Sequence, residues 1–260
     1  MSHTAFYNEI LHHMPSLAGK LHVYETLEST NITAKAMAEK GAVSGTVIIA
    51  ERQTGGRGRL GRRFHSAHGS GIYMSMILRP SQIGTDVLPI TAMAAVCVAE
   101  AAEALGSAPL SIKWVNDVYK NGKKVCGILT EGVFSPDKQQ IPHIILGIGV
   151  NVYTPEGGFH SEIESIADSI FSTCQAGLRS QLIAEILKRV DTYLAQLDTK
   201  PFLSAYRARD MLSGRNVQVF RGAESYPATV VGIGDDFSLH VCTADGTPIA
   251  LTSGEVSIRF

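Results

Sequence analysis

The sequence predicts an α+β fold: a mixed β-sheet flanked by helices, followed by a small C-terminal β-barrel. Two observations support this prediction. Most of the predicted strands follow one another through short turns, whereas a doubly wound sheet would separate them by helices. The last fifty or so residues contain only short strands and turns, which suits a small barrel. With 260 residues, of which 45% are hydrophobic and 18% charged, we expect a large domain over residues 1–211 and a small one over residues 212–260.

The first half of the chain contains three predicted strands and two predicted helices. Residues 21–27 form a predicted strand, and the polar residues 28–31 can cap a helix that runs to about Lys40 and ends at Gly41. Further strands are predicted at residues 46–50 and 72–78, on either side of a glycine-rich loop. A long apolar helix is predicted at residues 86–105 and stops at Gly106.

Hairpins dominate the second half. We predict strands at residues 110–115, 124–134 and 141–152, with a turn at residues 116–123. Two helices follow, at residues 178–197 and 201–211. After Ser213 the predicted elements are short strands between glycine- and aspartate-containing turns, at residues 216–221, 225–233, 238–242 and 248–251.

Composition excludes several classes of protein. The formal net charge is only -1, and the N-terminus has no apolar signal-peptide core. The longest apolar run, residues 92–99, is too short to span a membrane. The four cysteines are far apart and indicate reduced, structural thiols in a cytoplasmic protein. Two histidine groups, His12 with His13 and His65 with His68, have no cysteine or carboxylate partners at ligand spacing, so we expect no metal site in the protein.

The most informative segment is residues 55–63, in which four arginines and four glycines occur within nine positions. Arginine presents a planar fork of donors to carboxylates and phosphates, and glycine lets a ligand approach backbone N–H groups. We therefore expect a flexible anion-binding loop, with a solvated basic loop as the alternative. The pattern Gly56, Gly58, Gly61 also matches a dinucleotide fingerprint, but a loop and a strand follow it where that fingerprint needs a helix.

Two further groups of residues indicate a site. Lys113, Asn116 and Asp117 surround the chain's only tryptophan at a predicted strand end, and Lys124 follows across a turn. The alternative here is a surface hairpin with a lysine-rich turn. A later strand carries two glycines in Gly147-Ile148-Gly149-Val150-Asn151, which often marks the close approach of a ligand. A bulge or a tight sheet crossing would explain these glycines equally well.

Five motifs together resemble the biotin protein ligases, in their short form without an N-terminal DNA-binding domain. The resemblance covers the chain from about residue 21 to the end. It implies a class II synthetase-like, biotin–lipoate ligase fold with an SH3-like C-terminal barrel. The motifs occur in the family's order and spacing: Ser29-Thr30-Asn31, the Gly-Arg-Gly-Arg-Leu-Gly-Arg loop, Lys113-Trp114-Val115-Asn116-Asp117, Lys124 with Gly127-Ile128-Leu129, and Gly147-Ile148-Gly149-Val150-Asn151.

The resemblance also implies a two-step reaction, that of a biotin–[acetyl-CoA-carboxylase] ligase. Biotin and ATP would form biotinyl-5′-AMP and pyrophosphate, with Mg²⁺ carried mainly by the phosphates. A lysine of a biotin carboxyl carrier protein or domain, belonging to a biotin-dependent carboxylase, would then take the biotinyl group. We expect a cytoplasmic enzyme without DNA or membrane partners. Family members occur as monomers and as dimers, so a homodimer is left open, as is the identity of the carboxylase.

Roles for individual residues follow from the same resemblance. The catalytic residues would be Arg57, Arg59, Lys124 and Asp117, the last orienting the acceptor lysine. Biotin would contact Ser29, Thr30, Asn31, Gln53, Arg57, Gly58, Arg59, Lys124, Gly127, Gly147 and Gly149. ATP would contact Arg59, Arg62, Phe64, Lys113, Asn116 and Asn151. No residue is expected to ligate a metal.

The sequence departs from the family pattern at two places. Val115 stands where the family usually has proline, which puts the geometry of that turn in doubt. Phe64 stands where many members have a tryptophan near adenine, and phenylalanine keeps the aromatic face without the indole N–H.

Three alternative functions are weighed against biotin ligation. A lipoate–protein ligase would need a long apolar tunnel and no polar trio at Ser29, Thr30 and Asn31. A DNA-binding repressor would need roughly three helices, and about twenty residues precede the first predicted strand. A non-catalytic biotin-binding module would not need Lys124 or the arginines.

The glycine content of residues 54–70 further predicts a loop that is mobile without ligand and ordered over biotin or the adenylate.

Overall fold

A seven-stranded mixed sheet forms the centre of the molecule. The computed structural model describes residues 3–79, 87–133, 143–222 and 224–258. The strand order is β1-β2-β3-β7-β6-β5-β4, and only β1 and β2 are parallel, because helix α2 crosses between them. The strands are β1 (Leu21–Leu27), β2 (Val47–Gln53), β3 (Gly71–Leu78), β4 (Ser111–Lys113), β5 (Asp117–Lys120), β6 (Lys123–Val133) and β7 (His143–Asn151). The predicted α+β class is confirmed.

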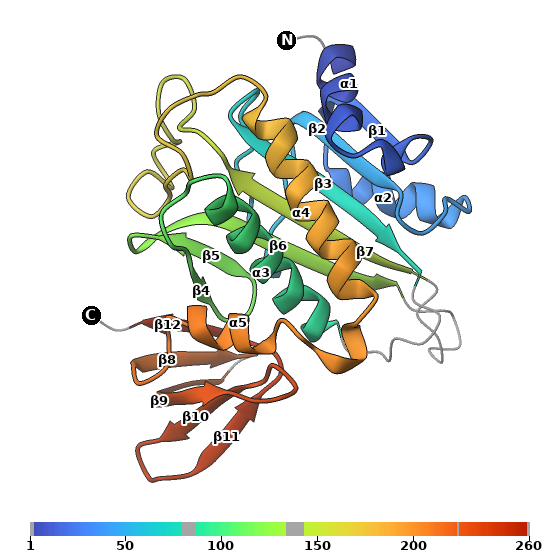
Figure 1. Cartoon of the computed structure of the whole chain (residues 1–260). Helices are drawn as coiled ribbons and strands as arrows, with labels where there is room; N and C mark the ends of the chain where they lie inside the picture. The colour runs from blue at the N-terminus through green and yellow to red at the C-terminus, as the bar shows by residue number, and fades with distance from the viewer. Residues whose placement is uncertain (1–2, 80–86, 134–142, 223, 259–260) are drawn as a thin grey trace.

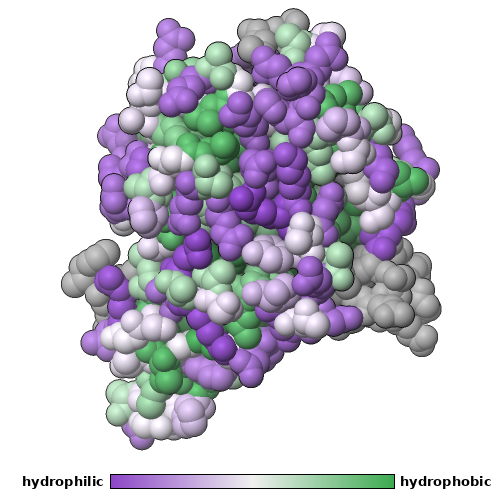
Figure 2. Space-filling view, in the orientation of Figure 1, coloured by the Kyte–Doolittle hydropathy of each residue, from purple (hydrophilic) through white to green (hydrophobic). Residues whose placement is uncertain are grey.

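Helices cover both faces of this sheet (Figure 1). Strand residues alternate between the faces, so Val47 and Ile49 join the main core with α3 (Leu88–Ala104) and α4 (Leu178–Leu194). Ile48 points to the opposite face, where α2 (Thr30–Glu39) buries two alanines against three isoleucines. The face that carries α2 also carries the site described below. On the other side, the outer surface of α4 is hydrophilic (Figure 2).

The N-terminal helix α1 (His3–His13) was not predicted. Its buried residues Phe6 and Ile10, with Met14 just beyond, recur every four residues, which is a helical period. The guanidinium of Arg179 in α4 lies 4.5 Å from the centre of the Phe6 ring. A short 3-10 turn, Pro15–Leu17, then leads into β1.

The C-terminal part forms a five-stranded antiparallel sheet in the order β11-β10-β9-β8-β12. Its strands are β8 (Asn216–Arg221), β9 (Glu224–Ile233), β10 (Leu239–Thr243), β11 (Pro248–Leu251) and β12 (Glu255–Ile258), of which β12 was not predicted. The proposed boundary at residue 211 falls between α5 (Leu203–Arg209) and β8. That these are separate domains stays a prediction.

The small sheet packs firmly against the end of the large one. The ring of Phe237 stacks on Phe202 with 5.3 Å between centroids, and the Trp114 indole N–H donates to the Phe237 carbonyl at 2.8 Å. Tyr206 packs edge-on against the same Phe237 ring and donates its hydroxyl to the Val115 carbonyl. This contact fixes residues of the small sheet at the edge of the cavity described below.

One predicted turn is wrong. Residues 116–123 contain the four-residue strand β5, so the turn itself is only Asn121 and Gly122. Both residues have left-handed backbone angles, with φ of 49° and 78°, as a two-residue hairpin turn requires. The preceding Trp114–Val115 peptide is cis.

Other predicted ends differ by a few residues. Helix α4 ends at Leu194, and a 3-10 turn, Leu197–Thr199, separates it from α5. Predicted positions 86, 134 and 141–142 lie outside the described residues. Within the described ranges, none of the helices combines the length and hydropathy that crossing a bilayer would require. The cysteines of the chain are all free thiols.

Candidate active site

A cavity of about 380 Å³ lies between the arginine–glycine loop (residues 54–70), the strands β4 to β6 and the small sheet. Its two carboxylates, Asp117 and Glu255, are outnumbered by six cationic side chains. These cations are Arg57, Arg59, Arg62, Arg63, Lys113 and Lys124. Such a concentration of positive charge in a protein of net charge -1 suits a polyanionic ligand.

A chain of hydrogen bonds fixes the polar groups on the floor of this cavity. Lys124 Nζ lies 2.7 Å from Asp117 Oδ1, and the Asn116 amide nitrogen donates to the same oxygen at 2.9 Å. The Asn116 side-chain oxygen Oδ1 in turn accepts from Arg59 Nη1 at 3.0 Å. Each group therefore orients the next, and these hydrogen bonds hold the ammonium and the guanidinium in place.

The side chains of Lys124 and Lys123 point to different sides of their strand, as strand alternation predicts. Lys124 lines the cavity, whereas Lys123 is exposed and its Nζ donates to the Glu164 carbonyl at 3.3 Å. Lys113 also lines the cavity, where burial lowers the pKa of its ammonium group and the nearby Asp117 carboxylate partly opposes that shift. Asn151 lines the same wall and donates to the Asp168 carbonyl at 3.1 Å.

The arginine–glycine loop folds back on itself over the cavity. Its N–H groups at Gly58 and Phe64 donate to the carbonyls of Arg62 and Gly56, at 2.7 and 2.9 Å. A Cβ on Gly56 would lie 2.3 Å from the Phe64 carbonyl oxygen, so this fold of the loop requires glycine there. Arg59 Nη2 donates to the Gly254 carbonyl at 3.1 Å. The loop is thus tied to the small sheet, and its mobility without ligand stays a prediction.

A second, smaller cavity of about 30 Å³ lies at the start of α2. Ser29, Thr30 and Asn31 line it, and each is buried. Ser29 occupies the N-cap position of α2 but makes no side-chain capping hydrogen bond. Polar groups buried at a helix N-terminus, where the first backbone N–H groups have no partner within the helix, can bind a polar ligand group.

Supporting residues fix the orientation of this trio. The backbone N–H and hydroxyl of Thr30 donate to Gln53 Oε1 at 2.8 and 3.1 Å, and the Gln53 amide donates to Ser66. Asn31 donates to Glu131 Oε2 at 2.6 Å and accepts from the Ser75 hydroxyl at 2.6 Å. The amide of Asn31 therefore has only one orientation that satisfies both neighbours.

Ser66, Ser75 and Glu131 were not identified from the sequence. Two of them, however, follow from strand alternation once the register is known. Ser75 pairs with Gly147, and Glu131 lies two residues beyond Leu129, which also pairs with Gly147. They therefore share the α2 face with the glycines.

Three glycines leave that face of the sheet bare between the two cavities. Gly127 and Gly149 are direct cross-strand partners, and Gly147 lies two residues before Gly149. A Cβ on Gly147 would lie 2.2 Å from Asn31 Oδ1, so α2 could not approach the sheet as it does. The result is a channel that runs from the polar trio to the cationic cavity.

Phe64 occupies this channel. A Cβ on Gly149 would meet its ring at 2.8 Å and one on Gly127 would meet it at 3.4 Å. Tyr73 packs edge-on against the ring, with 6.3 Å between centroids, and burial raises the pKa of Tyr73 to about 12, so that its phenol stays neutral. Phe64, which the family resemblance places near adenine, thus lines both cavities and lies between them.

All the residues assigned from the sequence line one of these two cavities. The larger holds Arg57, Gly58, Arg59, Arg62, Phe64, Lys113, Asn116, Asp117, Lys124, Gly127 and Asn151. The smaller holds Ser29, Thr30, Asn31, Gln53, Gly147 and Gly149. Sequence analysis missed the rim at residues 254–256, which the small sheet supplies, and Ile163, Ile166 and Ala167 from the connection after β7.

One expectation about histidines is corrected by the fold. His65 was expected to have no carboxylate near it, but Glu162 lies within 3.4 Å and His160 stacks on its ring. No sequence signal could have joined segments almost a hundred residues apart.

Comparison with known proteins identifies the kind of site. Residues 23–151 match the model of the biotin/lipoate A/B protein ligase family. The chain is 33% identical to the bifunctional ligase/repressor BirA of Bacillus spizizenii over 227 residues, which is 85% of this chain and 69% of that protein. It is 30% identical to the biotin–[acetyl-CoA-carboxylase] ligase of Mycobacterium tuberculosis over 250 residues, 91% of this chain and 88% of that one.

A solved structure gives the same result. The biotin protein ligase of Aquifex aeolicus, in complex with biotin and ATP, superposes with a TM-score of 0.77 and is 29% identical, covering 92% of this chain and 98% of that one. Fold and site thus define a ligase that attaches a cofactor to a protein through the carboxylic acid of the cofactor. This chain belongs to the biotin/lipoate A/B protein ligase family.

Proposed function

We propose that this chain is an ATP-dependent biotin protein ligase, which makes biotinyl-5′-AMP and transfers biotin to a lysine of a biotin carboxyl carrier protein or domain. One observation carries the proposal. A buried polar pocket and a cavity rich in cations adjoin across a row of glycines, with the Phe64 ring between them. Biotin has a polar ureido ring, an apolar chain and a carboxylate in the same order.

The polar pocket suits the ureido ring. Ser29, Thr30 and Asn31, with Gln53, offer hydroxyl and amide groups that their neighbours already hold in fixed orientations. A ligand that cannot use the hydrogen-bonding capacity still open in this pocket, such as that of the Ser29 hydroxyl, which makes no capping hydrogen bond, would leave buried polar groups unpaired and bind less well. The dithiolane ring of lipoate has no ureido group, so this pocket favours biotin.

The cationic cavity suits the first chemical step. A carboxylate oxygen of biotin attacks the α-phosphorus of ATP, the bond to the β-phosphate oxygen breaks, and pyrophosphate leaves. Negative charge builds up on the α-phosphoryl oxygens, and Arg57, Arg59 and Lys124 would stabilise it from positions set before binding. Arg62, Phe64, Lys113, Asn116 and Asn151 would face the nucleotide.

Mg²⁺ fits this cavity only as a partner of the phosphates. Among the described residues that line the cavity, the two carboxylates are already engaged, Asp117 with Lys124 and Glu255 with Arg62. No cage of protein oxygens is therefore preformed, and Mg²⁺ commonly retains water and substrate phosphates as ligands. Bound there, it would neutralise phosphate charge while the cationic side chains of the chain orient the α-phosphate.

The second step needs a neutral amine. The acceptor lysine Nζ attacks the carbonyl carbon of the mixed anhydride, AMP leaves with the bridging oxygen, and the nitrogen loses a proton. Asp117 would orient this amine, while the neighbouring cations favour its uncharged form. The named activity of the relative from Mycobacterium tuberculosis supports a carboxylase carrier as the partner.

Pyrophosphate release with biotin or lipoate as the acid tests the proposal. We expect release that depends on ATP and biotin, with lipoate at background, followed by biotin transfer to an isolated carrier domain. Release with lipoate equal to that with biotin would favour a lipoate–protein ligase. Biotin binding without any pyrophosphate release would indicate a non-catalytic binding module.

A further inference from the structure

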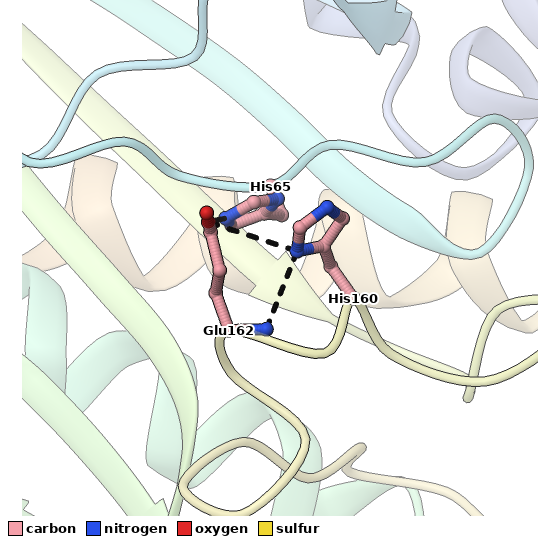
Figure 3. A group of neighbouring side chains, drawn as sticks. All are labelled: His65, His160 and Glu162. Atoms are coloured by element: carbon pink, nitrogen blue, oxygen red, sulfur yellow. Dashed lines mark hydrogen bonds and ion pairs between the residues drawn. The ribbon is translucent and has the colours of Figure 1, made fainter.

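We propose that His65, His160 and Glu162 form a binding site for a divalent transition metal at the mouth of the large cavity. Figure 3 shows the three side chains converging from two segments of the chain. Their ligand atoms all lie within 4.8 Å of one another. No part of the proposed ligase reaction uses these residues, and binding of a metal here does not depend on that reaction.

The two segments present the ligands in a defined way. His160 and Glu162 lie on one turn, in which the His160 carbonyl accepts from the N–H groups of Ile163 and Glu164 at 2.9 and 3.0 Å. His65 comes from the arginine–glycine loop and lines the cavity. Its ring stacks on that of His160 with 4.7 Å between centroids.

The two distances from the carboxylate to the imidazoles are close to those between ligands of a coordinated metal. Glu162 Oε2 lies 3.4 Å from His65 Nε2 and 3.6 Å from His160 Nδ1. Bonds of about 2.0–2.2 Å from a metal to nitrogen and oxygen ligands place neighbouring ligand atoms roughly 3–3.5 Å apart. Small side-chain movements would therefore complete the site, and the exposure of Glu162 leaves further positions for water.

The ligand types select the class of metal. Two imidazole nitrogens and one carboxylate suit Zn²⁺, Co²⁺, Ni²⁺ or Cu²⁺, whereas Mg²⁺ prefers oxygen ligands throughout. An ordinary exposed ion pair would explain one histidine beside Glu162, but such a pair contributes little. His160 Nδ1 also accepts a hydrogen bond from the Glu162 backbone N–H at 3.3 Å, which holds this imidazole beside the carboxylate, and a bound metal would replace that bond (Figure 3).

A metal here would connect the arginine–glycine loop to the turn that carries His160 and Glu162. The turn with His160 and Glu162 is anchored to the strand of Lys124, since Lys124 N–H donates to the Ile166 carbonyl at 2.8 Å and Asp168 N–H donates to the Lys124 carbonyl at 3.0 Å. His65 belongs to the arginine–glycine loop, which lines the same cavity. A bound metal would strengthen the contact between these two segments and hold the loop closed.

Titration of Co²⁺ into the full chain, carrying no added histidine tag and no biotin or ATP, tests the site through visible absorption. We expect one Co²⁺ per chain. His160→Ala and Glu162→Gln should each weaken Co²⁺ binding at least about tenfold, because the loss of even a residue that only supports a metal ligand usually lowers metal affinity by that factor. His68→Ala, in the same loop, and His12→Ala, in the other histidine pair, are the matched controls and should bind as the unchanged chain does.

The same titration can overturn the proposal. Co²⁺ affinity in His160→Ala and Glu162→Gln within about threefold of the unchanged chain would do so, as would a loss confined to His12→Ala. Tryptic cleavage at the arginines of the loop tests whether the metal connects the loop to the turn of His160 and Glu162. Co²⁺ should slow this cleavage in the unchanged chain but not in His160→Ala, and equal cleavage with and without Co²⁺ would rule out loop closure by the metal.

Discussion

Phe64→Ala should make biotin bind faster and more tightly in the absence of nucleotide. The pocket beside Ser29, Thr30 and Asn31 has a volume of about 30 Å³ while the Phe64 ring lies in the glycine channel. That is room for about two water molecules, each of which needs at least roughly 10–15 Å³ by the same kind of measure. A bicyclic ring cannot enter, so the phenyl ring must leave before biotin binds.

The contacts of the ring set the size of the effect. Its edge-on packing with Tyr73, at 6.3 Å between centroids, is of a type worth about 0.5–1.5 kcal/mol. With about 1.4 kcal/mol for each factor of ten in affinity, removal of the ring should tighten biotin binding by about two- to twelvefold. The gain should come from the association rate, because the alanine variant has no ring to displace.

Stopped-flow fluorescence can measure this, since Trp114 is the chain's only tryptophan and lines the large cavity. Phe64→Tyr, which keeps a ring in the channel, should associate at nearly the rate of the unchanged chain. A slower association in Phe64→Ala, or weaker biotin binding at an unchanged melting temperature, would show that the ring helps to bind biotin rather than blocking its entry.

Four further predictions concern the cationic side chains and the loop. Arg59→Ala should lower biotin-dependent pyrophosphate release about 10²–10³-fold, which is the usual effect of losing one hydrogen-bond donor to the charge that develops in the transition state. Arg52→Ala, at an exposed position of β2, should leave release unchanged. Similar losses in both variants would contradict a transition-state role for Arg59. Lys124→Ala should impair release and also transfer from supplied biotinyl-5′-AMP, and Lys123→Ala should impair neither; normal transfer by Lys124→Ala would exclude the second role. Burial lowers the pKa of Lys113, so its charge is lost earlier than that of an ordinary lysine as pH rises, and Lys113→Arg should move the alkaline fall of ATP-dependent release to higher pH; an unmoved fall would remove Lys113 from the nucleotide site. Biotin should tighten the binding of a non-hydrolysable ATP analogue by ordering the arginine–glycine loop first, and equal affinities by calorimetry would contradict that coupling.

Elements with strong periodicity could be predicted from the sequence, and elements without it could not. The strands at residues 21–27, 216–221 and 248–251 have the predicted bounds, because alternating or apolar runs end there at polar residues. Strand β5 was hidden because its four residues read as part of a lysine-rich turn, although Asn121-Gly122 is a strong hairpin signal. Helix α1 was hidden because histidines and other polar residues separate its few apolar positions.

The residues of the site also fall into those that could be found from the sequence and those that could not. Residues such as Gly147 and Arg59 stand out in the sequence, because a glycine inside a strand or an arginine among glycines needs an explanation. Residues that orient others do not stand out, because Ser75 and Glu131 are ordinary residues until the register places them beside Asn31. The rim at Glu255 depends on how the small sheet packs, which no local pattern encodes.

The three glycines explain why the site lies on this face of the sheet and what shape of ligand it accepts. Strand alternation directs Ile145, Gly147 and Gly149 toward α2, and the first of these is a core residue while the other two carry no side chain. The α2 face therefore changes, within one strand, from packed core to open channel. Asn31 enters over Gly147, and a ligand chain can pass over Gly149 and its partner Gly127 only when the Phe64 ring withdraws. A molecule that fills this path must have a hydrogen-bonding ring at the α2 end, a thin apolar middle against the bare backbone, and an anionic end among the cations. A branched or bulky middle would collide with the sheet, so we expect the glycines to select the chain of the ligand as strictly as the polar trio selects its ring.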